Sequence, residues 1–161
     1  MFPKRNKYAI ELRNFLYFGF QKCYTFIVDG RRGGAAISED RMKDHESEEM
    51  YLETILLLKG RKAAVRSIDV AESLGYAKSS VSRAVNLLQD RGYIVIDADG
   101  FIGFTDEGER RAERIYDRHL TLTRFFSELG ASDAAAERNA CRIEHVIDDE
   151  IFELIKARLG K

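Results

Sequence analysis

Three side chains able to bind a metal or to act as nucleophile and base lie close together near the C-terminus: Cys141, Glu144 and His145. The whole chain has only two cysteines and three histidines. On a helix, positions three and four apart share a face, so a thiolate, a carboxylate and an imidazole spaced this way can bind one ion. The same spacing also suits a buried helix face without any ion. The spacing alone leaves both interpretations open.

A second pair with the same spacing lies in "SEEMYLETILLLKG", where Met50 and Glu53 are three residues apart. We predict a helix here, with Ser47 as its N-cap and Gly60 after its last apolar residue. His119 lies in an apolar stripe of a later helix, and a single histidine in such a stripe is more often a hydrogen-bonded core residue than a ligand. If Glu144 is buried, a divalent cation would offset its desolvation penalty.

An enzymatic use of these residues has little support. Cysteine and histidine can form a nucleophile and base, and a metal can activate water. However, the sequence lacks a His-Glu-x-x-His pattern, a glycine-rich phosphate loop and a nucleophile elbow. We therefore predict that the protein is not an enzyme.

Composition predicts a mostly helical intracellular protein. The 161 residues are 45% hydrophobic and 33% charged, and the single proline is Pro3, so the strongest helix breaker is absent from the rest of the chain. The two distant cysteines and the lack of a clean secretory signal favour a reducing cytoplasm. Basic residues are concentrated in residues 1–34, which leaves an acidic body that suits a cation-binding protein.

The N-terminal segment differs from the rest of the chain. Its aromatic-rich stretch, residues 14–30, is short for a membrane span and is interrupted by Gln21 and Lys22. Met42 then precedes a polar lead-in to the first clear helix. We predict that residues 1–41 are a non-native or disordered extension, that the functional protein starts at Met42, and that no membrane is involved.

A helix-turn-helix pattern follows in "VRSIDVAESLGYAKSSVSRAVNLLQDRGYIV", with Gly75 at the turn and the second helix from about Lys78 to Arg91. Its apolar face carries Val81, Val85 and Leu88. Hydroxyl and basic side chains of this kind reach phosphates and base edges in DNA. The predicted DNA-contacting residues are Lys78, Ser79, Ser80, Ser82 and Arg83. A merely solvated face is the alternative, but an excess of basic residues across the segment favours nucleic acid.

The next segment predicts a wing and then three helices. Apolar residues flank the Asp99-Gly100 turn signal, and Thr105 is a candidate cap for a helix from Thr105 to Leu129. Ser132 and Asp148 are candidate caps for the two helices that follow. We expect the last helix to present a stripe of Ile151, Ile155 and Leu159. Asp148, Asp149 and Glu150 then belong to its cap and first turn and are not predicted ligands.

Taken together, "EEMYLETILLL", the winged helix, "YDRHLTLTRFF" and "CRIEHVIDDEIFELI" resemble the diphtheria toxin repressor and manganese transport regulator family of metal-dependent transcriptional repressors. The resemblance runs from Met42 to the end. It implies a mainly α protein with a winged helix-turn-helix DNA-binding domain over residues 42–104 and a helical metal-binding and dimerisation domain over residues 105–161. It also implies a homodimer that binds a double-stranded DNA operator when a divalent ion is bound between the domains.

The resemblance also implies a set of ligands. Met50, Cys141, Glu144 and His145 match the primary site of the iron-responsive branch, whereas Glu53 and His119 match positions that the manganese branch uses for a second ion. Thr123 and Glu137 stand where the iron branch has other ancillary ligands, and the SH3-like third domain of that branch has no counterpart. Because sulfur donors suit Fe(II) better than Mn(II), we expect Fe(II), with Mn(II) as the alternative.

The resulting prediction is a cytoplasmic repressor that senses Fe(II) or Mn(II) and controls metal-homeostasis genes. The alternative is a metal-independent winged-helix transcription factor in which Cys141 is a redox sensor and Glu144 and His145 are structural.

Overall fold

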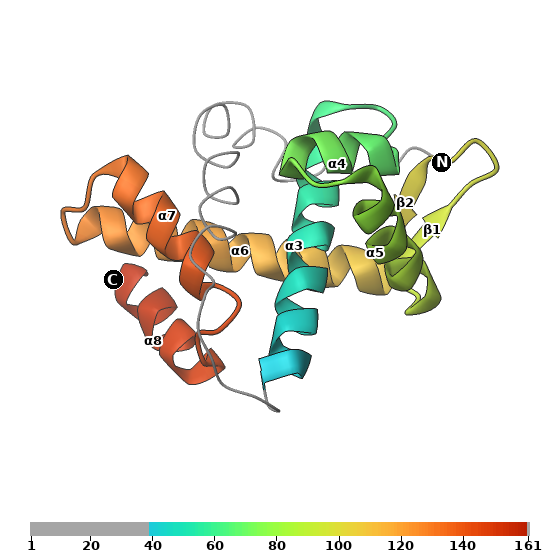
Figure 1. Ribbon diagram of the computed structural model, residues 1–161. Helices are drawn as coiled ribbons and strands as arrows, with labels where there is room; N and C mark the ends of the chain where they lie inside the picture. Colours follow the sequence, from blue (N-terminus) through green and yellow to red (C-terminus); the bar gives the residue numbers. More distant parts are fainter. Residues whose placement is uncertain (1–38, 161) are drawn as a thin grey trace, which may run out of the picture.

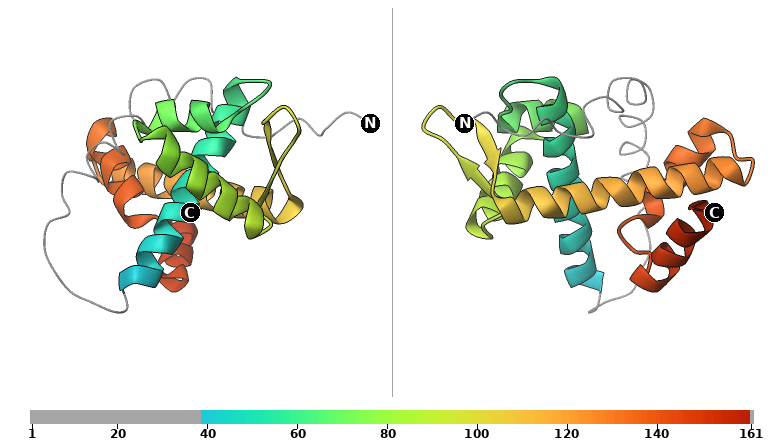
Figure 2. Two further views of the ribbon diagram at one scale, coloured as in Figure 1. Left: turned by 45° about the vertical axis from the view of Figure 1, so that its right-hand side comes forward. Right: turned by 180° about the vertical axis from the view of Figure 1, so that it is seen from behind.

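A computed structural model describes residues 39–160, with side chains from residue 47 onward. The elements are α3 (Glu39–Arg61), α4 (Ser67–Leu74), α5 (Lys78–Asp90), β1 (Ile94–Ile96), β2 (Ile102–Phe104), α6 (Asp106–Glu128), α7 (Asp133–Ile143) and α8 (Asp149–Leu159). This order confirms the predicted mainly α fold with a winged helix-turn-helix followed by a helical domain. The long helices α3 and α6 cross each other, with α4, α5 and the hairpin at one end of α6 and α7 and α8 at the other (Figures 1 and 2).

The start of α3 corrects one prediction. The helix begins at Glu39, so Ser47 is inside it and is not its N-cap, and Gly60 lies in its last turn. Residues 39–46 are polar and rich in helix formers without a proline, so nothing in them ends the helix. Apart from Glu39–Arg41, which open α3, the predicted extension over residues 1–41 lies outside the described residues.

The helix-turn-helix forms as predicted. Gly75 ends α4 in the left-handed conformation, with φ of 70°, which glycine adopts at little cost. Helix α5 buries Val81, Val85 and Leu88. The predicted turn and the predicted apolar face are both confirmed.

The wing is a two-stranded antiparallel hairpin in which Ile94 pairs with Phe104 and Ile96 with Ile102. The Ile102 amide donates to the Val65 carbonyl at 2.8 Å. In addition, Lys59 Nζ donates to the Ile102 carbonyl at 3.2 Å. These bonds attach the hairpin to the segment around the C-terminal end of α3.

Helix α6 starts with the predicted cap, because Thr105 Oγ1 accepts a hydrogen bond from the Gly108 amide at 3.1 Å. It buries Ala112, Ile115, Tyr116, His119, Leu122 and Thr123. Phe126, also predicted on this face, is half-buried. Ser132 and Asp148 occupy the predicted N-cap positions of α7 and α8, but neither side chain makes a capping hydrogen bond.

The core has two parts that share α6. The larger part joins α3, α4, α5, the hairpin and the first half of α6, and it includes Cys141. The smaller part consists of Leu122, Ala140 and Phe152, from α6, α7 and α8. Helix α3 packs against α4, α5 and α6, and α6 packs against β2, α7 and α8, so these two helices connect the two ends of the molecule.

The buried face of α8 differs from the prediction. The helix buries Phe152, whereas Ile151 is 48% exposed and Ile155 is only half-buried. This short helix carries apolar residues on several of its faces, so their periodicity does not predict which face is buried. Packing against α6 determines the buried face. The exposed residues Leu129, Val146, Ile151 and Leu154 leave apolar surface on this end of the molecule.

Asp69 is expected to stabilise the start of α4 in a pH-dependent way. It accepts hydrogen bonds from Lys62 Nζ at 2.5 Å and from the Arg66 amide at 2.8 Å. The Lys62 contact, followed by the Arg66 amide, lowers the pKa of this carboxyl. The stabilisation is therefore complete above the unfolded-state pKa of about 3.9 and is lost as pH falls through the lower folded-state pKa.

We expect Asp69→Asn to reduce the free energy of unfolding by about 0.5 to 1 kcal/mol at pH 7. The difference from the unsubstituted protein should shrink as pH falls toward about 3. Urea denaturation across this pH range measures it. Glu72→Gln, on the exposed side of the same helix, is the control. A loss in Asp69→Asn that is equal at both ends of the pH range would contradict the assignment.

Candidate metal centre

Three buried side chains from three parts of the chain converge where α3 crosses the C-terminal helices. Glu53 comes from α3, His119 from α6 and Glu144 from the end of α7, and one ligand atom of each lies within 4.8 Å of the others. Glu53 and Glu144 are fully buried. Two carboxylates and an imidazole at this separation are a donor set for a divalent cation.

The surroundings of the two Glu144 carboxylate oxygens indicate that this donor set fits a cation. His119 Nδ1 lies 2.6 Å from Glu144 Oε2. The other oxygen, Oε1, is buried, accepts no hydrogen bond from the described residues, and lies 3.4 Å from His145 Nε2. A buried carboxylate oxygen without a hydrogen bond is costly, and a cation would offset that cost.

His145 faces the cluster from the side. Its Nδ1 lies 3.0 Å from Glu49 Oε2, which leaves Nε2 facing Glu144. Burial by itself lowers the pKa of His145, but the hydrogen bond to Glu49 and the charges of Glu144, Glu53 and Glu49 together outweigh it, so the pKa is raised. The surroundings of this imidazole therefore favour positive charge.

The spacing prediction for the C-terminal trio holds only in part. Helix α7 ends at Ile143, so Glu144 and His145 lie in the turn after it and not on the helix with Cys141. Glu144 still has helical backbone angles, and its amide donates to the Ala140 carbonyl at 3.0 Å. The side chain of Glu144 therefore points close to the direction that a continued helix would give it.

The predicted sulfur donors lie among apolar neighbours. Cys141 is 1% exposed and belongs to the larger core. Met50 is half-buried against the same core, and the Tyr76 hydroxyl donates to its Sδ at 3.9 Å. Of the six predicted ligands, the close cluster contains Glu53, His119 and Glu144, with His145 beside it. Whether Met50 and Cys141 act as ligands stays a prediction.

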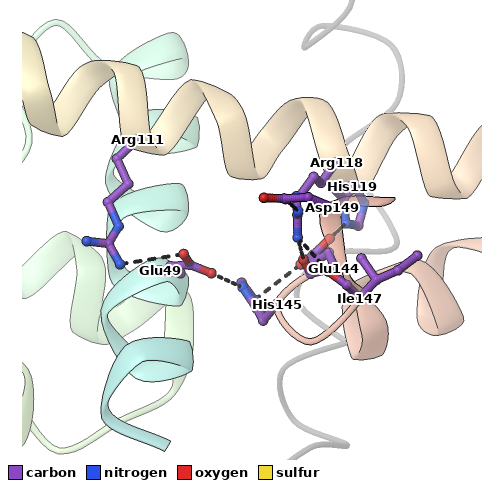
Figure 3. A network of polar contacts seen from close by, with 8 residues as sticks. All are labelled: Glu49, Arg111, Arg118, His119, Glu144, His145, Ile147 and Asp149. Atoms are coloured by element: carbon purple, nitrogen blue, oxygen red, sulfur yellow. Dashed lines mark hydrogen bonds and ion pairs between the residues drawn. The ribbon is translucent and has the colours of Figure 1, made fainter. Parts of the chain in front are cut away.

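Sequence reasoning missed the arginine that holds the ligand-bearing turn. Arg118 Nη1 donates to the Glu144 carbonyl at 3.0 Å and to the Ile147 carbonyl at 3.1 Å. Its Nη2 pairs with Asp149 in the first turn of α8. Figure 3 shows these contacts beside those of Glu144 and His145. The only sequence signal was the position of Arg118 next to His119.

The predicted DNA-contacting residues lie on the outer face of α5. Lys78, Ser79, Ser82 and Arg83 are exposed, and Ser80 is half-buried. The face opposite to them is the one that packs into the core. The helix therefore presents a polar, basic surface, and contact with DNA stays a prediction for each of these residues.

Two protein-domain families match this chain, one over the DNA-binding part and one over the C-terminal part. The model for the iron-dependent repressor N-terminal DNA-binding domain matches residues 45–100, and the model for the metal-binding and dimerisation domain of such repressors matches residues 105–161. An uncharacterised HTH-type transcriptional regulator of Methanocaldococcus jannaschii is 32% identical over 118 residues, which are 72% of this chain and 94% of the relative. The chain belongs to the iron-dependent repressor family. This confirms the predicted resemblance to the diphtheria toxin repressor and manganese transport regulator family.

Further relatives of this repressor include a second curated regulator and two solved structures. The HTH-type regulator MntR of Lysinibacillus sphaericus is 31% identical over 68% of this chain and 82% of the relative. The solved structure of T. acidophilum IdeR has a TM-score of 0.62 at 28% identity and covers 71% of this chain. A manganese-dependent repressor in complex with manganese has a TM-score of 0.64 at 27% identity and covers 70% of this chain. The repressor spans about half the length of these two structures.

Family membership confirms several predictions at a coarse level. The repressor has one domain of the DNA-binding type and one of the metal-binding and dimerisation type, and it is a transcriptional regulator and not an enzyme. DNA and a second copy of the chain are the partners for which these domains are named. The comparisons do not separate iron from manganese. None of the described helices combines the length and the apolar character needed to cross a membrane.

Proposed function

We propose that this chain is a cytoplasmic repressor that binds Fe(II) or Mn(II), and that the ion strengthens its binding to operators of metal-homeostasis genes. The observation that carries the proposal is the buried cluster of Glu53, His119 and Glu144. Its members come from α3, which packs under the helix-turn-helix, and from α6 and α7 of the C-terminal domain. Ligand binding at such a junction can change the relative placement of the two domains.

The chemistry supplied by the ion is electrostatic. A bound divalent cation would neutralise the buried carboxylates Glu53 and Glu144, with His119 and His145 as nitrogen donors. Within the protein, α3 contacts α4 and α5 of the DNA-binding domain as well as α6 of the C-terminal domain. The position of α3 against α6 therefore sets where α5 lies relative to the dimerisation domain.

The identity of the ion depends on which donors take part. The expected Fe(II) rests on Met50 and Cys141, whose sulfur atoms suit the softer ion. The donors that lie close together are oxygen and nitrogen, which suit Mn(II) as well. We retain Fe(II), with Mn(II) as the alternative, and a side-by-side titration decides between them.

For DNA binding we propose the exposed face of α5, with Arg83 as a base contact and Lys78 and the serines Ser79, Ser80 and Ser82 as phosphate contacts. The redox alternative has less support, because Cys141 is 1% exposed and redox-sensing cysteines are accessible.

The test is the affinity for DNA with and without metal. A duplex selected from a random library by the metal-loaded protein serves as the operator, and fluorescence anisotropy is measured anaerobically with Fe(II), with Mn(II) and with a chelator. We expect metal to tighten binding about 5- to 150-fold, which is the usual range of coupling between two sites. Arg83→Ala should weaken operator binding at every metal concentration. Equal operator affinity of the unsubstituted protein with metal and with chelator would contradict the proposal.

A further inference from the structure

Glu49 is a buried carboxylate on α3 that contacts two residues of the C-terminal domain. It is 5% exposed. One oxygen lies 3.0 Å from His145 Nδ1, and the other forms an ion pair with Arg111 Nη2 at 3.6 Å. Figure 3 shows Glu49 between these two residues, with Arg111 reaching it from α6. Because a buried carboxylate needs charged or donating partners, these contacts hold α3 in one position relative to α6 and the ligand-bearing turn.

The contact with His145 orients the imidazole toward the metal cluster. With Nδ1 on Glu49, Nε2 faces Glu144 at 3.4 Å. In metal sites, a carboxylate that accepts a hydrogen bond from one ring nitrogen sets the tautomer and the ring direction, and so prepares the other nitrogen for the ion. Glu49 has the position and the chemistry for this role.

Arg111 extends the contact to the base of the wing. Its Nη1 donates to the Tyr93 hydroxyl, and its guanidinium lies over the Tyr93 ring at 4.9 Å from the centroid. Tyr93 immediately precedes β1, and its carbonyl accepts a hydrogen bond from the Thr105 amide at 3.0 Å. Arg111 therefore contacts a residue whose backbone is part of the hairpin base.

The neighbouring residue on α3 makes a parallel contact. Glu48 forms an ion pair with Arg91, the C-cap residue that follows α5. Two successive carboxylates of α3 thus contact the end of α5 and, through Arg111, the start of the wing. The same turn of α3 also contacts the metal-ligand histidine.

We propose that Glu49 and Arg111 are positioning residues that connect the metal centre to the wing: Glu49 orients His145, and Arg111 links Glu49 to Tyr93. This inference rests on the proposed function, because it concerns how metal binding alters DNA affinity. In this proposal, the metal centre and the wing are connected by these polar contacts as well as by the packing of α3 against α6.

The test compares Arg111→Met with Arg110→Met. Arg110 is the adjacent residue of α6, is exposed, and pairs with Glu107, so its replacement removes the same charge without touching Tyr93. The quantity measured is the ratio of operator affinities with Mn(II) and with chelator. We expect Arg111→Met to reduce this ratio at least threefold and Arg110→Met to leave it unchanged. Tyr93→Phe, which removes only the hydroxyl, should reduce it in the same direction and is the milder variant if Arg111→Met folds poorly.

A second readout does not use DNA. In amide spectra of nitrogen-15-labelled protein, addition of Zn(II), a diamagnetic probe, should shift the resonances of both His145 and Tyr93. In Arg111→Met, the shift at Tyr93 should fall by more than half while that at His145 persists. Glu49→Gln should in addition lower the affinity for Mn(II), by about 10- to 100-fold, as expected for loss of a carboxylate that orients a ligand histidine.

The outcomes separate the inference from the function on which it rests. If the unsubstituted protein shows a ratio of one with Mn(II) and also with Fe(II) in place of Mn(II), the proposed function fails. If its ratio is well above one and both Arg111→Met and Tyr93→Phe keep it, the proposed function stands and the Glu49–Arg111 connection is wrong. An equal reduction of the ratio in Arg110→Met and Arg111→Met also overturns the inference, because the loss of one positive charge would then explain the change in both variants.

Discussion

Glu144→Ala is expected to abolish the metal response of this repressor. Glu144 contacts His119, faces His145 and lies within the cluster that includes Glu53. Removal of a residue that merely supports a ligand lowers metal affinity by about 10- to 100-fold, so loss of Glu144 itself should cost at least about 100-fold. At metal concentrations near the dissociation constant of the unsubstituted protein, where the variant binds almost no ion, its operator affinity should then be the same with Mn(II), with Fe(II) and with chelator.

The same loss should appear in stability, which requires no operator. At a metal concentration about 100-fold above the dissociation constant, binding adds about 2.7 kcal/mol to the free energy of unfolding. A variant with about 100-fold weaker affinity gains only about 0.4 kcal/mol at that concentration. Urea denaturation with and without Mn(II) measures the difference.

Glu144→Gln separates metal binding from folding. The amide keeps the shape of the side chain and a polar contact with His119, and it removes one of the buried negative charges beside Glu53. Without metal, this variant should be at least as stable as the unsubstituted protein, because like charges in a buried cluster oppose folding. Glu153→Ala, an exposed position on α8, should keep the full metal response. A full metal response in Glu144→Gln would contradict the assignment of Glu144 as a ligand.

Gly108→Ala is expected to cause the largest loss of stability. A Cβ at Gly108 would lie 1.8 Å from the Tyr93 carbonyl oxygen and 2.7 Å from its carbonyl carbon. These are backbone atoms, and the oxygen accepts hydrogen bonds from the Thr105 amide at 3.0 Å and from Thr105 Oγ1 at 3.1 Å. The clash cannot be relieved by a rotamer change, so the start of α6 would have to move away from the hairpin.

We expect a loss of about 3 kcal/mol or more, at the upper end for overpacking. That is a large share of the 5 to 15 kcal/mol typical of a folded domain. Gly160→Ala is the control, because a Cβ there would be 3.6 Å from the nearest atom, the Lys156 carbonyl oxygen, and should change stability by less than about 0.5 kcal/mol. Urea denaturation without metal measures both variants. A loss below about 1 kcal/mol in Gly108→Ala would show that the helix and hairpin are not tightly apposed.

The elements that depend on local signals could be predicted from the amino-acid sequence. The turn at Gly75, the apolar face of α5 and the Thr105 cap of α6 each follow from residues a few positions apart. The order of these elements, together with the motif around Cys141, was sufficient to indicate the repressor family. The predictions were wrong where the local signals were absent or ambiguous, as at the start of α3 and on the buried face of α8.

The set of side chains that form the candidate site depends on contacts between residues far apart in the sequence. Glu144 meets His119 across 25 positions of sequence, and His145 meets Glu49 across 96. Helical spacing describes neighbours on one helix, whereas these contacts depend on how α3, α6 and the turn after α7 pack together. Burial at that junction removes the hydration of Glu49, Glu53 and Glu144. Their negative charge must then be compensated by groups of the protein or by a bound cation.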